Sequence, residues 1–164
     1  MPFSPKHILI PVAIDPEDDL ILARHAVSAA CDIAEKFDSK ITLLHLSAPV
    51  MGQSSSGAVD ISGKVYEALK NILKERLEHG RKKLTDLSKY IEDRGIKVEG
   101  RVMESIDNTA DAVVQNAQVL KADLLIIGSH GRRGLSRMLF GSVAQKVAER
   151  THVPILLLHP SKEE

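Results

Sequence analysis

Short apolar runs alternate along this chain with longer segments in which apolar residues recur every three or four positions. Continuous apolar runs predict strands buried on both faces, and the three-four spacing predicts amphipathic helices. The expected strands cover residues 7–13, 40–46, 96–103, 123–128 and 151–158. The expected helices cover residues 15–37, 64–94, 105–120 and 141–150. This alternation predicts an α/β fold with a five-stranded parallel sheet, right-handed crossovers and helices on both faces.

Several residues mark where these helices begin, bend and end. Asp15 is expected to cap the first helix, and Ser105 or Asp107 the third, because such side chains accept hydrogen bonds from the free amides of a helix start. In the second helix, Gly80 is expected to mark a bend and Gly95 the C-terminal stop.

Length and composition indicate one domain over residues 1–164, with a flexible polar loop at about 47–63. The chain has 22 basic and 22 acidic residues and 3% aromatic residues, which argues against nucleic acid or an anionic membrane as a partner. Its one cysteine, Cys31, excludes an intramolecular disulfide. Because no apolar run reaches about 18 residues, we expect a soluble cytoplasmic protein.

The candidate chemistry lies where the strand at 123–128 leaves the sheet. Gly128 is followed after two residues by Gly131, and after nine more by Gly141-Ser142 at a predicted helix start. Glycine lets the backbone approach a ligand, and free amides at a helix start attract anions, so this spacing predicts a phosphate site. Arg132 is a candidate for neutralising the phosphate charge. The loop is neither a Walker A loop nor a GxGxxG dinucleotide loop.

The expected topology places this loop at a ligand crevice. A doubly wound sheet of five strands is expected in the order 3-2-1-4-5, and ligands bind where the order reverses, between strands 1 and 4. Strand 1 ends at Pro11-Val12-Ala13, and strand 4 ends at Ile127-Gly128. Each glycine alone is also typical of a plain turn or a plain helix start. Their coincidence at the switch point favours a ligand site.

The glycine spacing, together with strands that end at Pro11 and at His45-Leu46, resembles the ATP-binding branch of the universal stress protein family over nearly the whole chain. The resemblance implies a Rossmann-like fold of the adenine nucleotide alpha hydrolase type, a homodimer and a cytoplasmic role in stress response or signalling. It implies ATP as the ligand, with AMP or ADP as alternatives, and Mg²⁺ only as a companion of the nucleotide. In this family the final strand often pairs with its twofold mate, which here places the dimer interface at residues 153–158.

Carried over position by position, the resemblance implies a set of nucleotide-binding residues. Adenine and ribose would contact Pro11, Val12, Leu46 and Ile127, the sugar and first phosphates Gly128, His130 and Gly131, and the terminal phosphates Gly141, Ser142 and Val143. One position departs from the pattern, because Ala13 stands where ATP-binding members typically carry Asp. A lost polar contact of about 1–3 kcal/mol predicts roughly ten- to hundredfold weaker binding.

No catalytic residue is assigned from the sequence. The 7 His residues are scattered, no motif typical of a structural metal site occurs, and no general base is placed beside the loop. The favoured function is therefore a nucleotide-binding module, and whether the chain is an enzyme stays open. Two alternatives remain: a slow ATP-hydrolysing or phosphoryl-transfer enzyme, and a dimeric scaffold with a weakened nucleotide site.

Overall fold

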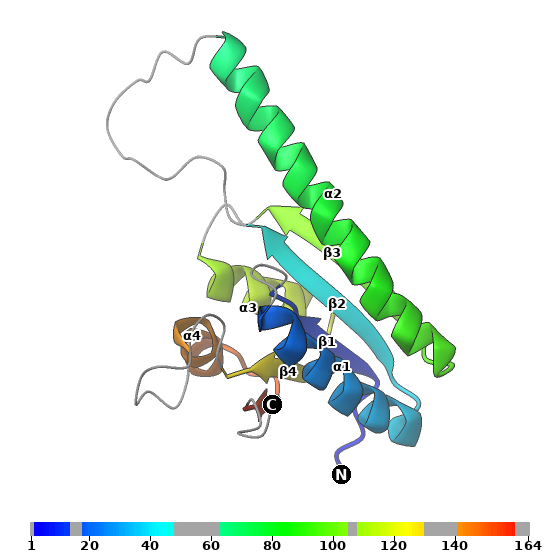
Figure 1. Cartoon of the computed structure of the whole chain (residues 1–164). Coiled ribbons are helices and arrows are strands. Elements are labelled where there is room, and N and C mark those ends of the chain that lie inside the picture. Colours follow the sequence, from blue (N-terminus) through cyan, green and yellow to red (C-terminus); the bar gives the residue numbers. More distant parts are fainter. Residues whose placement is uncertain (1, 14–17, 48–62, 105–107, 130–140, 160–164) are drawn as a thin grey trace.

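The computed structural model describes residues 2–13, 18–47, 63–104, 108–129 and 141–159, which form a parallel sheet with helices on both faces (Figure 1). The strands are β1 (His7–Pro11), β2 (Lys40–Ser47), β3 (Val98–Glu104), β4 (Leu124–Gly128) and β5 (Ile155–Leu158). The helices are α1 (Asp18–Phe37), α2 (Gly63–Asp93), α3 (Thr109–Val119) and α4 (Ser142–Arg150). The sheet order β3-β2-β1-β4-β5 confirms the predicted order 3-2-1-4-5.

Strand β2 runs farther than its neighbour β1 toward the carboxyl edge of the sheet. The last paired residues of β1 and β2 are Pro11 and Leu44, whereas β2 and β3 stay paired as far as Ser47 and Glu104. Residues 45–47 therefore extend past the end of β1. We call these residues the β2 overhang.

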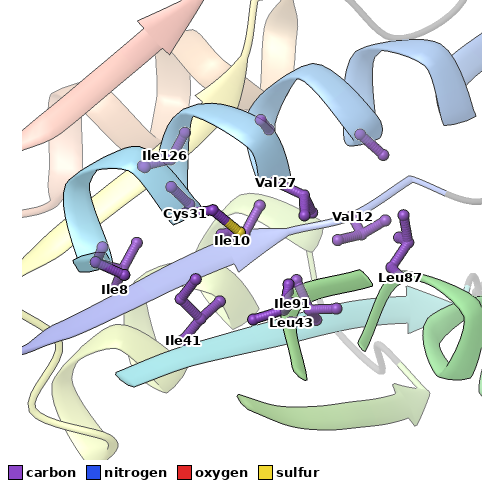
Figure 2. Close-up of a cluster of buried hydrophobic side chains, with 14 of the residues drawn as sticks. Ile8, Ile10, Val12, Val27, Cys31, Ile41, Leu43, Leu87, Ile91 and Ile126 are labelled. Carbon is purple, nitrogen blue, oxygen red and sulfur yellow. The ribbon is translucent and has the colours of Figure 1, made fainter. Parts of the chain in front are cut away.

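Two apolar cores hold the helices on the sheet. On one face, Cys31 of α1 and Leu87 and Ile91 of α2 pack with strand residues such as Ile10 and Leu43 (Figure 2). On the other face, α3 and α4 pack alanine and valine side chains against leucine and isoleucine residues of β1, β2 and β4. Burial raises the pKa of the Cys31 thiol, so this cysteine serves as an apolar packing residue.

Polar contacts join the amino ends of the strands. His7 Nδ1 donates to the Leu120 carbonyl at 2.9 Å, and His7 Nε2 accepts from the Thr42 hydroxyl at 2.8 Å. The Asp123 carboxylate accepts from the backbone amides of Lys6 and His7 at 2.8 and 2.9 Å. These bonds fasten the start of β1 to β2 and to the segment that connects α3 with β4.

The cap of α3 differs from the prediction. Asn108, and not Ser105 or Asp107, occupies the N-cap position, and its side chain accepts from the Ala110 amide at 3.0 Å. All three side chains can accept such a bond, and the sequence does not rank them because the helix start depends on where β3 ends. The predicted cap of the first helix, Asp15, lies outside the described residues.

The role of Gly80 also differs from the prediction. Helix α2 continues through Gly80 without interruption, and a Cβ atom at this position would come within 2.8 Å of His45 Cδ2. Glycine is therefore needed for the close approach of α2 to β2, and the predicted bend is wrong. Gly95, with a φ of 76°, is confirmed as the stop that follows α2.

Two elements extend differently from the predicted ranges. Strand β5 covers only Ile155–Leu158 of the predicted 151–158. The amino-terminal half of α2 extends beyond the sheet (Figure 1), so Ile72 of the predicted apolar stripe is exposed. None of the helices in the described ranges is long and apolar enough to cross a membrane.

Candidate functional site

A pocket of about 200 Å³ opens at the carboxyl ends of β1 and β4, where the sheet order reverses. Its walls come from the ends of β1, β2 and β4, from one face of α1, and from the beginnings of α3 and α4. This is the place that the predicted topology assigns to a ligand.

The structure brings most of the described candidate residues together in this pocket. The candidates that line it are Pro11, Val12, Ala13, Leu46, Ile127, Gly128 and Val143. Gly141 and Ser142 lie at the start of α4, directly before Val143. His130, Gly131 and Arg132 lie outside the described residues. The arrangement supports a common site, and the role of each residue in nucleotide binding stays a prediction.

Other lining residues were not identified as site residues from the sequence. They are Leu22, Ala23, Ala26, Leu44, Thr109 and Val113. Those on α1 and α3 follow the three-four spacing of a buried helix face. Such spacing cannot distinguish side chains that pack on the sheet from side chains that border a pocket. These residues become apparent only when α1 and α3 are placed around the ends of the strands.

Gly128 is in close contact with helix α1. A Cβ atom at this position would come within 2.3 Å of Cδ2 and 2.5 Å of Cγ of Leu22. Glycine is needed here because the helix side chain occupies the space of a side chain on the strand. The first glycine of the predicted phosphate loop therefore has a packing role that does not depend on a ligand.

The β2 overhang turns a backbone amide and a carbonyl toward the pocket. Even-numbered residues of β2 direct their backbone groups toward β1, because the Lys40 amide donates to the Lys6 carbonyl and the Leu44 carbonyl accepts from the Val12 amide. Leu46 has the same orientation but lies beyond the end of β1. Its N–H and C=O therefore face the pocket, and none of the described residues supplies them with a backbone partner on that side.

The backbone of Val12 already makes two hydrogen bonds. Its amide donates to the Leu44 carbonyl at 2.8 Å, and its carbonyl accepts from Nδ1 of the buried His45 at 3.0 Å. Because Nδ1 donates, the neutral imidazole carries its proton on that nitrogen. His45 thus links the wall of the pocket to the position where α2 has Gly80.

The start of α4 presents backbone amides beside the pocket. Gly141 is the N-cap residue, and the Gln145 amide donates to its carbonyl at 3.0 Å. The amides of residues 142–144 precede this bond and have no partner within the helix. The Gly141 amide donates to the Ser129 carbonyl instead. Ser142 is the first helical residue, so of the two roles open to its hydroxyl, helix cap or phosphate contact, the cap is excluded and the phosphate contact stays a prediction.

The pocket lining is almost entirely apolar. Among the described lining residues, Thr109 alone has a polar side chain. This lining suits the flat and weakly polar parts of a ligand, with backbone groups as its hydrogen-bonding partners. Within the part of the chain that the structure describes, no three His, Cys, Asp or Glu side chains form a metal-binding group.

The chain matches a known protein family over most of its length. Residues 5–159 match the Universal stress protein family. Universal stress protein MJ0531 of Methanocaldococcus jannaschii is 32% identical over 162 residues, which cover 97% of this chain and 85% of that protein.

Solved structures share the fold. The structure of MJ0577 from Methanocaldococcus jannaschii has a TM-score of 0.75 at 24% identity, covering 96% of this chain and 98% of that chain. A universal stress protein family protein from Arabidopsis thaliana was solved with AMP bound. It has a TM-score of 0.66 at 18% identity, and the match covers 97% of this chain and 94% of that chain. At these identities the likeness shows that the chains share an architecture.

Proposed function

The chain belongs to the universal stress protein family, and from this premise we propose that it binds an adenine nucleotide in the pocket at the carboxyl ends of β1 and β4. The observation that carries the proposal is the backbone of Leu46, whose N–H and C=O face an apolar pocket beyond the end of β1. The edge of adenine offers a matching pair, because N1 accepts a hydrogen bond and the N6 amino group donates one. The AMP complex of the Arabidopsis protein supports this class of ligand.

The size of the pocket indicates how the nucleotide would lie. A volume of about 200 Å³ is smaller than the roughly 300–1,000 Å³ typical of sites that enclose a whole ligand. The base and ribose would occupy the pocket, between Val12 and Leu46 on one side and Ile127 on the other. The phosphates would leave the pocket past Val143, toward the amides at the start of α4.

The residues proposed to contact the phosphates rest on two kinds of evidence, their position in the structure and the family resemblance. We propose that the amides of residues 142–144 bind a phosphate oxygen, which is supported by their position at the helix start, where Ser142 is exposed. His130, Gly131 and Arg132 are proposed as phosphate or sugar contacts from the family resemblance alone. We propose ATP as the ligand, with AMP and ADP as shorter alternatives.

The donor set near the pocket fits a nucleotide that brings its own metal ion. No carboxylate occurs among the described lining residues, so Mg²⁺ would be held by phosphate oxygens and water. Bound there, Mg²⁺ would neutralise phosphate charge. The chain itself would contribute the apolar walls, the Leu46 backbone and the amides of α4.

The position of Ala13 predicts limited affinity. Ala13 is exposed at the rim of the pocket and offers no acceptor to a ribose hydroxyl. An Asp at this position would add a charge-assisted hydrogen bond, which corresponds to roughly ten- to hundredfold tighter binding.

Titration calorimetry with AMP, ATP and GTP tests the proposal. We expect AMP and ATP to bind, and GTP to bind at least about tenfold more weakly, because guanine presents a donor at N1 and an acceptor at O6. Ala13→Asp should raise the affinity for AMP and ATP. Ala68→Asp, on the exposed surface of α2, is the matched control and should leave it unchanged. Absence of binding by all three nucleotides at millimolar concentration would contradict the proposal.

We also propose a twofold dimer that forms through β5. This strand lies at the edge of the sheet, and its apolar side chains from Ile155 to Leu158 are only partly buried. Pairing with a second β5 would satisfy the open edge and cover these side chains. A monomer in light scattering at micromolar concentration would contradict this assembly. The cytoplasmic location and the role in stress response are proposed from the family alone.

A further inference from the structure

We propose that His45 is a positioning residue that keeps the Leu46 amide open to the ligand by holding the Val12 carbonyl away from it. The inference rests on the proposed nucleotide site and concerns a residue outside the pocket lining. It explains why the ladder between β1 and β2 stops where the pocket begins.

One hydrogen bond of the ladder between β1 and β2, from the Leu46 amide to the Val12 carbonyl, is missing among the described residues, and this absence points to the role of His45. In a parallel ladder, a residue that donates to one strand neighbour accepts from the residue two positions later on that neighbour. The Val12 amide donates to the Leu44 carbonyl at 2.8 Å, so the regular continuation is a bond from the Leu46 amide to the Val12 carbonyl. That bond does not occur among the described backbone hydrogen bonds.

The imidazole competes for the acceptor that this bond would use. His45 Nδ1 donates to the Val12 carbonyl at 3.0 Å. The ring lies on the face of the sheet that α2 covers, because its Cδ2 atom is next to the Cα position of Gly80. The carbonyl is therefore drawn out of the ladder toward α2, and the Leu46 amide is left facing the pocket.

Glycine at position 80 gives the ring its place. A Cβ atom on Gly80 would come within 2.8 Å of His45 Cδ2 and within 3.2 Å of Val102 Cγ1. Helix α2 thus packs against the Cδ2 edge of the imidazole, and Nδ1, on the other edge of the ring, makes the bond to the Val12 carbonyl. The donor nitrogen is held by packing as well as by its own hydrogen bond.

Amide hydrogen exchange of the protein without nucleotide tests the inference directly. His45→Phe keeps a ring and removes the donor, and His45→Asn keeps a donor near the position of Nδ1. We expect the Leu46 amide to exchange at least tenfold more slowly in His45→Phe than in the native protein, because the Val12 carbonyl closes on it. His45→Asn should behave as the native protein, and so should the matched control His79→Phe, whose side chain is exposed on α2. Equal exchange of the Leu46 amide in the native protein and in His45→Phe would overturn the inference.

A second variant covers the case in which His45→Phe does not fold. Gly80→Ala displaces the ring from the helix side, and we expect the same slowing of exchange at Leu46. Unchanged exchange in a folded Gly80→Ala protein would count equally against the role of His45.

Ligand binding gives an independent readout. An AMP analogue with carbon in place of N1 cannot accept a hydrogen bond from the Leu46 amide. We expect His45→Phe to weaken AMP binding about tenfold and to leave binding of the analogue unchanged. An equal loss for both ligands would show a general disruption of the pocket and overturn the inference. If the native protein binds no adenine nucleotide, the proposed function fails, and the exchange experiment still decides whether His45 holds the ladder open.

Discussion

Gly128 of β4 lies directly against Leu22 of α1, so closely that a Cβ atom on the glycine would approach Leu22 Cδ2 to 2.3 Å. Leu22 also lines the pocket. The contact therefore joins two roles, because the same side chain packs helix against strand and forms part of the ligand wall. Any group added at Gly128 must move Leu22.

Gly128→Ala is expected to lower the free energy of unfolding by about 1–3 kcal/mol, because the added methyl overpacks the contact with Leu22. Nucleotide affinity should fall as well, since Leu22 is displaced at the pocket wall. Urea unfolding and calorimetry measure the two effects. Gly100→Ala on β3 is the matched control, because its Cβ would meet no atom closer than 3.6 Å. Adding Leu22→Ala to Gly128→Ala should recover part of the nucleotide affinity, and failure to do so would contradict the steric explanation.

Gly80→Ala separates intrinsic helix propensity from tertiary packing. In an exposed helix this change stabilises by about 1 kcal/mol. Here the methyl would collide with His45, so we expect a net loss of about 1–3 kcal/mol in urea unfolding. Combining it with His45→Asn, a smaller side chain, should remove most of that loss. A stabilised Gly80→Ala protein would show that α2 can shift away from β2 without cost.

Asn108→Ala should remove the cap of α3 and lower the free energy of unfolding by about 1 kcal/mol. The physical reason is the loss of the hydrogen bond that the Ala110 amide donates to the Asn108 side chain over 3.0 Å. Asn108→Asp keeps the acceptor and should be close to the native stability. Asn71→Ala, on the exposed surface of α2, controls for the general effect of replacing Asn by Ala. Equal losses at Asn71 and Asn108 would argue against a capping role.

His7 should make stability depend on pH. Burial, followed by the charge of Lys40, lowers the pKa of His7 below its ordinary value. The unfolded chain therefore binds the proton more readily, so the contribution of His7 is complete above about pH 6.5 and is lost as the pH falls toward the folded-state pKa.

Urea unfolding at pH 7.5 and at pH 5.5 measures this dependence. We expect the native protein to be less stable at pH 5.5, and His7→Gln to show a smaller difference between the two conditions. His152→Gln, at an exposed position, should keep the native difference. The same difference in the native protein and in His7→Gln would exclude His7 as its source.

The large features of the fold were predictable because each depends on a long pattern. Apolar runs and three-four spacing give the strands, the helices and the order of the sheet, and the topology locates the crevice. The details that the sequence did not reveal depend on contacts between distant segments. Gly80 looks like a bend until His45 is placed beside it. The packing of Gly128 against Leu22 is equally invisible in the sequence, and the ligand role of Gly128 stays a prediction.

The site was predictable at its walls and less so in its hydrogen bonds. Pro11, Val12 and Ile127 follow from the ends of the strands. The role of the Leu46 backbone depends on β2 extending past the end of β1. That extension is set by the register in which the two strands pair. Register is set by the packing of the whole sheet, so no local motif around Leu46 could have revealed it.

Because α2 is long, a small tilt of the helix at Gly80 would displace its amino-terminal end by several times as much as the helix near Gly80. The helix from Gly63 to Gly80 is about 25 Å long, and this arm reaches beyond the sheet (Figure 1). A tilt of about 10° at the His45 contact would move the tip of the arm by roughly 4 Å. The helix would thus pivot at the His45 contact. Small changes at that contact would become larger displacements at the tip, which a distance probe near Tyr66 can record.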